Sequence, residues 1–135
     1  MYGRLAGRLE GMGDEEWAWR PTPDDRVGLR WRLQHITEML AEDRNWQWLH
    51  GPMAPPPTPA QAGSAAAVVA GLGDAFAAWR ALLRALSDAD LAEPIGAPAG
   101  PYGDASRRSF VLHIADEFIH HSAEAALLRD LYAAV

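Results

Sequence analysis

The sequence predicts an all-α protein, a four-helix bundle with a shortened first helix. Three long segments carry apolar residues at the i, i+4, i+7 spacing of a helix with one buried face. No segment alternates apolar and polar residues as a half-buried strand does, and segments rich in Pro and Gly separate the periodic ones. The 135 residues fit one domain, 1–135, which is long enough to bury a core without disulfides.

The first predicted elements are a weak short helix, a loop and a long helix. A short helix is expected over residues 2–12, where three glycines weaken it. An ordered loop is expected over residues 17–25. A long helix then runs over residues 27–49, with Asp24 or Asp25 as its N-cap. Its inward stripe contains Trp31, His35, Ile36, Met39, Leu40, Asp43 and Trp46.

Residues 51–63 contain five prolines and are expected to form a flexible loop that crosses one end of the bundle. Ser64 is the expected N-cap of the next helix, which reaches about Leu86. Ser87 and the acidic residues after it are expected to close that helix.

Residues 91–103 form a second loop in this prediction, because they hold three Pro and three Gly. The last helix is expected to begin near Asp104 or Ser106 and to continue to about Tyr132. Its inward stripe contains Phe110, Ile114, Glu117, His121, Ala125 and Leu128.

Composition narrows the function classes. The net charge of −6 leaves no basic patch for phosphates, so nucleic acid is excluded as a partner. No apolar run approaches the roughly 20 residues of a membrane span, so no membrane association is expected. The chain has no Cys, which suits a cytoplasmic protein and leaves it without a thiol nucleophile of its own.

The densest chemistry lies in the last helix. Glu117 and His121 are four residues apart, so they stack on one helix face and form a half-site for zinc or a similar divalent ion. Both interrupt an apolar stripe, where an unpaired carboxylate costs several kcal/mol. His35, on the inward stripe of the first long helix, is the natural third ligand. The three would leave an open coordination position, as catalytic zinc sites do.

Other interpretations of these residues stay open. Glu117 and His121 can form a buried hydrogen-bonded pair without a metal, or both can face solvent. His113 can replace Glu117 as ligand, act as its partner, or line the mouth of a pocket. His120 is expected to face solvent or a neighbouring helix. Glu124 can orient the His121 ring or pair with an arginine at the surface.

Two motifs resemble the DinB/YfiT-like family of metal-binding four-helix bundles, within the mycothiol-dependent maleylpyruvate isomerase-like N-terminal domain superfamily. One is Leu33-Gln-His-Ile36, and the other begins Leu112-His-Ile-Ala-Asp-Glu-Phe-Ile-His-His-Ser-Ala-Glu124. The stretch from Trp79 to Leu91 also looks like the family's third helix and its exit. Together these motifs cover most of the chain.

The resemblance implies a ligand set. Members bind zinc, nickel or a similar ion with a His on the second helix and a His-x-x-x-His pair on the last. His35 and His121 carry over by position, whereas Glu117 stands where many members have the first His of the pair. The related maleylpyruvate isomerases look similar in using His, Glu and His. A second departure is the first helix, which is usually longer in the family.

The resemblance also implies a function. It is that of a metal-dependent S-transferase, or a hydrolase, acting on a small electrophile with an external low-molecular-weight thiol of the mycothiol or bacillithiol type. The alternative is a non-catalytic metal-binding protein associated with stress or with a protein partner. A homodimer is compatible with the resemblance. No catalytic residue beyond the metal ligands and no specific substrate is assigned.

Overall fold

The computed structural model describes all residues, 1–135, and its regular structure is entirely helical. The predicted all-α class is therefore confirmed. The elements, in chain order, are α1 (Tyr2–Leu9), α2 (Asp14–Ala18), the 3-10 helix η1 (Asp25–Val27), α3 (Leu29–Ala41), α4 (Asp43–Trp48), α5 (Ala65–Arg84), α6 (Asp88–Ala92), the 3-10 helix η2 (Ala97–Tyr102) and α7 (Arg107–Tyr132).

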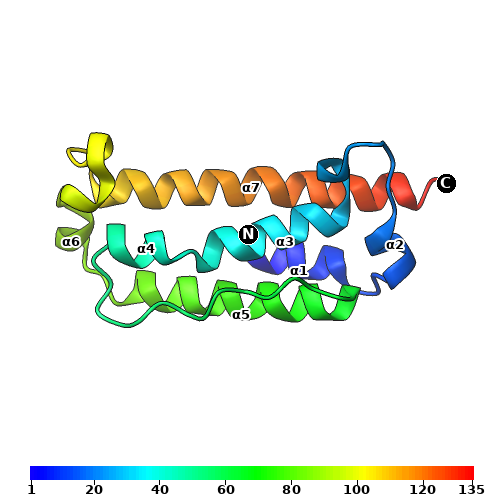
Figure 1. Cartoon of the computed structure of the whole chain (residues 1–135), viewed down its shortest axis with the longest axis horizontal. Coiled ribbons are helices and arrows are strands. Elements are labelled where there is room, and N and C mark those ends of the chain that lie inside the picture. Colours follow the sequence, from blue (N-terminus) through cyan, green and yellow to red (C-terminus); the bar gives the residue numbers. More distant parts are fainter.

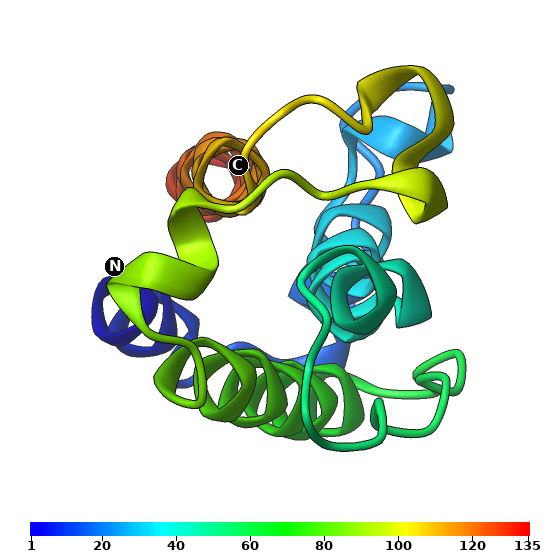
Figure 2. The same ribbon diagram turned by 90° about the vertical axis from the view of Figure 1, so that its left-hand side faces the viewer.

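Four rods make the bundle. Figure 1 shows α7 as the longest rod and α5 as a shorter one, with α3 and α4 in series forming one further rod. The end view in Figure 2 places α1 as the fourth rod, between α5 and α7. Because α1 has 8 residues and α7 has 26, α1 covers only part of the bundle, as the prediction of a short first helix requires.

The core lies between these rods and consists of leucines, isoleucines and aromatic rings from each of them. The strongest packing joins α3 to α5, and α3 also packs on α7. Burying each such side chain contributes roughly 1.5–3 kcal/mol. The fully buried residues at the centre include Leu5, Leu33, Ile36, Leu40, Leu72, Leu82 and Ile114.

The first long helix is broken where the sequence predicted continuity. Glu42 adopts an extended backbone (φ −64°, ψ 130°) and separates α3 from α4. The break leaves carbonyl groups of α3 without helical partners. The fully buried Asn45 side chain supplies them, because its Nδ2 donates to the carbonyls of Met39 at 2.8 Å and Leu40 at 3.3 Å. The break also turns Asp43 outward, so its predicted place on the inward stripe is wrong.

The proline-rich loop follows a different course from the expected one. It runs along the side of α5 back to the other end of the bundle, so that α3, α4 and α5 run parallel (Figure 1). Gln34 fixes it, because Nε2 donates to the Ala60 carbonyl and Oε1 accepts from the Ala62 amide, both at 3.2 Å. The loop is therefore attached to α3.

The observed helix caps confirm some of the predicted helix boundaries and contradict others. Ser64 and Ser106 cap α5 and α7 as predicted. Asp24 caps η1, and Gly28 precedes α3. Ser87 is the N-cap of α6 and forms a capping box with Asp90. The sequence predicted only that the preceding helix ends there. Short elements such as α2, α6 and η2 have too few residues to show a period.

By length and composition alone α5 could cross a membrane. The expectation of no membrane association stays a prediction. In this structure it instead packs against α3 within the bundle. The same test is passed by core helices, and α5 directs Val68, Leu72, Ala75, Trp79 and Leu82 into the core.

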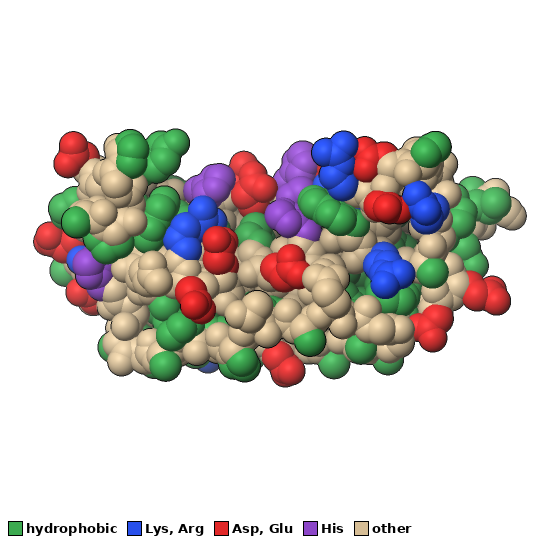
Figure 3. All heavy atoms as spheres, in the orientation of Figure 1, with side chains coloured by type: hydrophobic (Ala, Val, Ile, Leu, Met, Phe, Trp, Pro, Cys, Tyr) green, Lys and Arg blue, Asp and Glu red, His purple; other side chains and the backbone are tan.

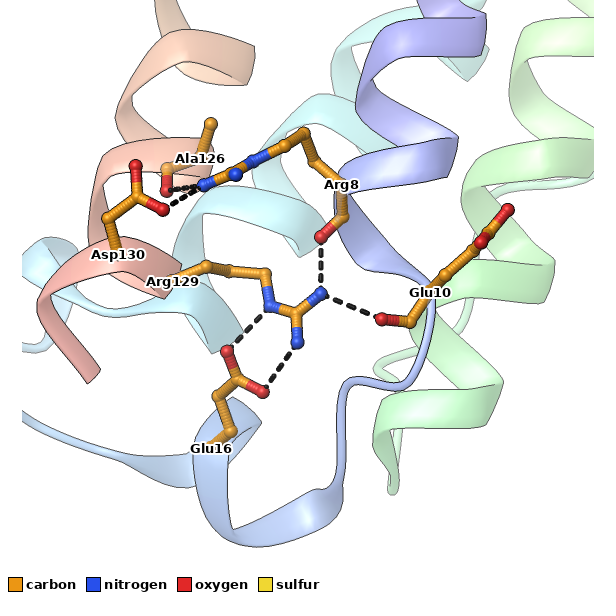
Figure 4. A network of polar contacts seen from close by, with 6 residues as sticks. All are labelled: Arg8, Glu10, Glu16, Ala126, Arg129 and Asp130. Atoms are coloured by element: carbon orange, nitrogen blue, oxygen red, sulfur yellow. Dashed lines mark hydrogen bonds and ion pairs between the residues drawn. The ribbon is translucent and has the colours of Figure 1, made fainter. Parts of the chain in front are cut away.

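An arginine network closes the end of the bundle where α1 stops (Figure 4). The guanidinium of Arg129 on α7 donates to both carboxylate oxygens of Glu16, at 2.6 Å and 2.9 Å. Its Nη1 donates to the carbonyls of Arg8 and Glu10, the latter at 2.9 Å. Those carbonyls lie at the C-terminal end of α1, where helical partners are missing. One partly buried guanidinium group therefore attaches α1 and α2 to α7.

Replacing Arg129 by Met should destabilise the fold by about 3 kcal/mol, because the nearly buried Glu16 carboxylate then loses its partner. Urea unfolding measures the change. Arg84→Met, at an exposed position on α5, is the control and should stay within about 0.5 kcal/mol of wild type. Adding Glu16→Gln to Arg129→Met should recover part of the loss. An unchanged unfolding midpoint in Arg129→Met would contradict the role of this pair.

Candidate metal centre

Three predicted residues come together between α3 and α7. His35 lies in the middle of α3, and Glu117 and His121 lie one turn apart on α7. One potential ligand atom from each lies within 4.8 Å of the other two. Nε2 of His121 is 3.4 Å from Oε2 of Glu117, and the rings of His35 and His121 meet edge to face with centroids 4.6 Å apart.

These donors suit a transition-metal ion. Two ligand atoms that each lie ~2.1 Å from one tetrahedral ion are roughly 3.4 Å apart. The Glu117–His121 pair already has this separation, and His35 lies close enough to complete the group. Two imidazoles and one carboxylate are a ligand set that zinc and nickel accept. The group could therefore hold a metal ion, with one coordination position left for water or substrate.

The His121 ring is oriented from its other side. Its Nδ1 lies 2.7 Å from Oε2 of Glu124, and Nη1 of Arg32 lies 3.0 Å from the same oxygen. Burial alone would raise the pKa of Glu124, but the His121 hydrogen bond and the Arg32 charge outweigh burial and hold that pKa below its usual range. An ionised carboxylate only accepts hydrogen bonds, so Nδ1 of His121 carries the proton. Nε2 is the ring nitrogen that faces Glu117, and it is the one available to a metal ion.

The His35 ring packs against an aromatic side chain of its own helix. Its ring stacks on Trp31, with centroids 4.6 Å apart and planes 13° from parallel. Burial and the neighbouring His121 lower the pKa of His35 below its ordinary value. The imidazole is therefore neutral at pH 7 and has a lone pair to offer a cation.

Glu117 differs from its predicted environment. Its side chain is 39% exposed, so the cost of burying an unpaired carboxylate does not by itself demand a metal there. Glu117 is partly exposed because it lies at the edge of the inward stripe of α7, where it lines a cavity and is not covered by another helix. What favours a metal is the convergence of all three side chains.

The other polar candidates lie around this group. His113 is exposed and outside it, so it lines a cavity and takes no place among the three. His120 is exposed, as predicted, and its Nε2 lies 3.1 Å from Oε1 of Glu124. His120, His121 and Glu124 also form a compact group. Arg32 opposes a cation there, because its charge already contacts the shared Glu124 oxygen.

Two cavities open beside the group. One of about 470 Å³ is lined by His35 and Glu117 together with Glu38, Met39, Glu42, Arg44, His113 and Ile114. The other, of about 650 Å³, is also lined by His35 and includes Trp31 and Arg30. Figure 3 shows histidine and acidic side chains gathered on this face, between the α3–α4 rod and α7. A small molecule could reach the group from solvent.

Sequence reasoning missed the role of Arg32. The sequence suggested an arginine at the surface as a partner of Glu124, whereas the partner is the partly buried Arg32 on α3. No local signal identifies Arg32, because the contact depends on how α3 and α7 are rotated against each other. It also missed the Trp31 stack, which a four-residue spacing from His35 does suggest.

The fold and this group define a class, that of helical bundles with a His, Glu and His group between facing helices. The family model described as the DinB superfamily matches residues 1–125. The chain therefore belongs to the DinB superfamily, as the motifs around His35 and His121 indicated. No curated protein and no solved structure matches the chain.

Replacing Glu124 by Gln should weaken zinc binding by about 10–100-fold, because the His121 ring loses the carboxylate that orients it. A competition titration against a chromophoric chelator measures the affinity. Asp116→Asn, an exposed position on the same helix, is the matched control and should leave the affinity unchanged. Equal affinities in the two variants would exclude an orienting role for Glu124.

The metal-free protein should lose stability as pH falls below about 6.5. In that range the unfolded chain protonates His35, whereas the folded chain holds the pKa of His35 lower by burial and by the nearby His121. The unfolded state then binds more protons, so the free energy of unfolding rises with pH through this window. Urea unfolding between pH 5 and pH 8 tests this, and His35→Gln should show a smaller slope.

Proposed function

We propose that the protein binds a divalent transition-metal ion, zinc or nickel, through His35, Glu117 and His121 and uses it to activate an external thiol or water against a small electrophile. The observation that carries this proposal is the convergence of the three side chains beside an open cavity of about 470 Å³. Three protein ligands and a free position are the arrangement of catalytic zinc sites.

The absence of Cys bears on the choice of nucleophile. Because the chain has none, a thiol reaction needs a low-molecular-weight thiol from outside. The bound ion would lower the pKa of that thiol or of water. In thiol transfer, the S–H proton leaves to solvent and the sulfur forms a bond to carbon as the leaving group departs with its electron pair. The protein's part is to orient His121 through Glu124 and to admit both reactants through the cavity.

A non-catalytic role is the second candidate, and one observation favours it. The group joins α3 to α7, and the Arg32–Glu124–His121 contacts join the same helices. An ion there would add a cross-link between two rods of the bundle and stabilise the fold by its binding free energy. An ion without an exchangeable position would favour this role over catalysis.

Elemental analysis of untagged protein should find close to one zinc or nickel ion per chain, and His35→Ala and His121→Ala should both lose it. His113→Ala is the matched control and should retain the ion, because His113 lies outside the group. Circular dichroism checks that each variant is folded. Protein that is isolated metal-free and also rejects added zinc and nickel would rule out the proposal.

Catalysis needs a separate measurement. Metal-loaded wild type should accelerate the reaction of a small thiol with a chromogenic aryl halide, and His121→Ala should lose the acceleration while remaining folded. Stoichiometric metal without acceleration for any thiol or for water would leave the non-catalytic role as the supported one.

A further inference from the structure

A second compartment adjoins the cavity of the candidate metal centre. It has a volume of about 410 Å³ and lies between α4, η2 and α7. Arg44 and His113 line both spaces, so the two are neighbours. The remaining walls of the second compartment are Trp48, Ile95, Tyr102, Ala105, Ser109 and Phe110.

The loop around η2 is built to hold Tyr102 at this place. Gly96 and Gly100 have positive φ angles of 86° and 52°, which side chains rarely adopt. A Cβ on Gly103 would lie 2.7 Å from the Gly96 carbonyl oxygen, so this residue must also be Gly. Backbone bonds from Ile95 to Ala105 and from Gly96 to Gly103 close the loop at 2.9 Å. Tyr102 therefore stands on a tightly closed turn.

Aromatic rings form the walls. Trp48 on α4 lies with its centroid 4.8 Å from Phe110 on α7 and 6.5 Å from Tyr102. The two pairs are tilted by 51° and 41°, so the rings do not fill the space by stacking on one another. Tyr102 is 67% exposed and Trp48 is half-buried, whereas Phe110 is buried. A flat apolar body would cover the surfaces of Tyr102 and Trp48 that are now in contact with water.

The charge of this compartment comes from one side chain. Arg44 is the one lining residue with a formal charge, since His113 is formally neutral and the other six are uncharged. Its guanidinium lies over Trp48 and Phe110, 5.2 Å and 5.6 Å from the ring centroids. Glu42 contacts Nη2 at 3.0 Å, whereas Nη1 has no protein partner and the buried Nε has none either. Arg44 thus retains donors for a second carboxylate.

We propose that this compartment binds small aromatic carboxylates, with the ligand ring against the exposed Tyr102 and the half-buried Trp48, beside the buried Phe110, and the carboxylate on Arg44. Apolar walls with few convergent polar groups are the usual composition of ligand sites. A cation would face Arg44 with like charge, and an aliphatic acid would make poorer contacts with the three rings. The claim that this compartment binds the substrate of the metal-dependent reaction rests on the proposed function. The claim that it binds aromatic carboxylates does not.

Binding is tested on the metal-free protein with phenylacetate as the probe, followed by the indole N–H resonance of Trp48, which Trp48→Phe assigns. Phenylacetate should shift this resonance in a saturable manner. Cyclohexylacetate, which lacks the flat ring, and phenethylamine, which reverses the charge, should bind more weakly.

Two variants test the walls. Arg44→Met should weaken phenylacetate binding about tenfold, the usual effect of losing a charged hydrogen bond. Tyr102→Ala should weaken it roughly fivefold, since one aromatic contact is lost. Arg84→Met and Leu131→Ala, exposed positions elsewhere, are the matched controls and should bind as wild type does. No shift of Trp48 at any phenylacetate concentration, or an affinity equal to that of wild type in both Arg44→Met and Tyr102→Ala, would overturn the proposal.

The metal experiment and the ligand experiment test different proposals, so the failure of one can be distinguished from the failure of the other. Saturable phenylacetate binding by a protein that takes up no metal would support this site and contradict the proposed function. Metal uptake with no effect of phenylacetate on Trp48 would do the reverse. If both hold, adding zinc should change the affinity for phenylacetate in wild type, and His121→Ala should remove that change.

Discussion

The contact between α3 and α7 determines what this molecule can do. Glu124 accepts from His121 and from Arg32, so one carboxylate orients an imidazole of its own helix and binds an arginine of the other. His121 is buried and the other two groups are partly buried, so an unpaired member would cost free energy. Rotating either helix would leave a member without a partner. The contact therefore fixes the relative rotation of the two helices, and with it the approach of His35 to Glu117 and His121.

The break at Glu42 is the second determinant, because it decides where α4 points. In a continuous helix each residue advances by about 100°, so Arg44 and Trp48 would follow the direction set by α3. The extended backbone at Glu42 resets that direction, and Asn45 satisfies the freed carbonyls. As a result Arg44 lies against Trp48 and Phe110, between the two neighbouring cavities. One residue of irregular backbone thus gives the candidate metal centre a neighbouring compartment.

Periodicity and caps were enough to predict the helical class, the span of α7 and the Ser64 and Ser106 caps, since these depend on residues close in sequence. The pairing of Glu117 with His121 follows from helix geometry in the same way. No sequence pattern predicts the break at Glu42. Asn45, which satisfies the freed carbonyls, is indistinguishable in the sequence from any other polar residue. Arg32 was missed for a related reason, since its partner lies 92 residues away and only the packing of two helices brings them together.

The stack of Trp31 on His35 has an optical consequence. The indole lies 4.6 Å from the His35 ring and 6.3 Å, edge to face, from the His121 ring. An ion shared by those imidazoles would sit within a few ångströms of an excited indole. A closed-shell ion such as zinc has no low-lying d–d states to accept that excitation, whereas an open-shell ion such as nickel does. The fluorescence of Trp31 would thus distinguish the electronic configuration of the bound ion.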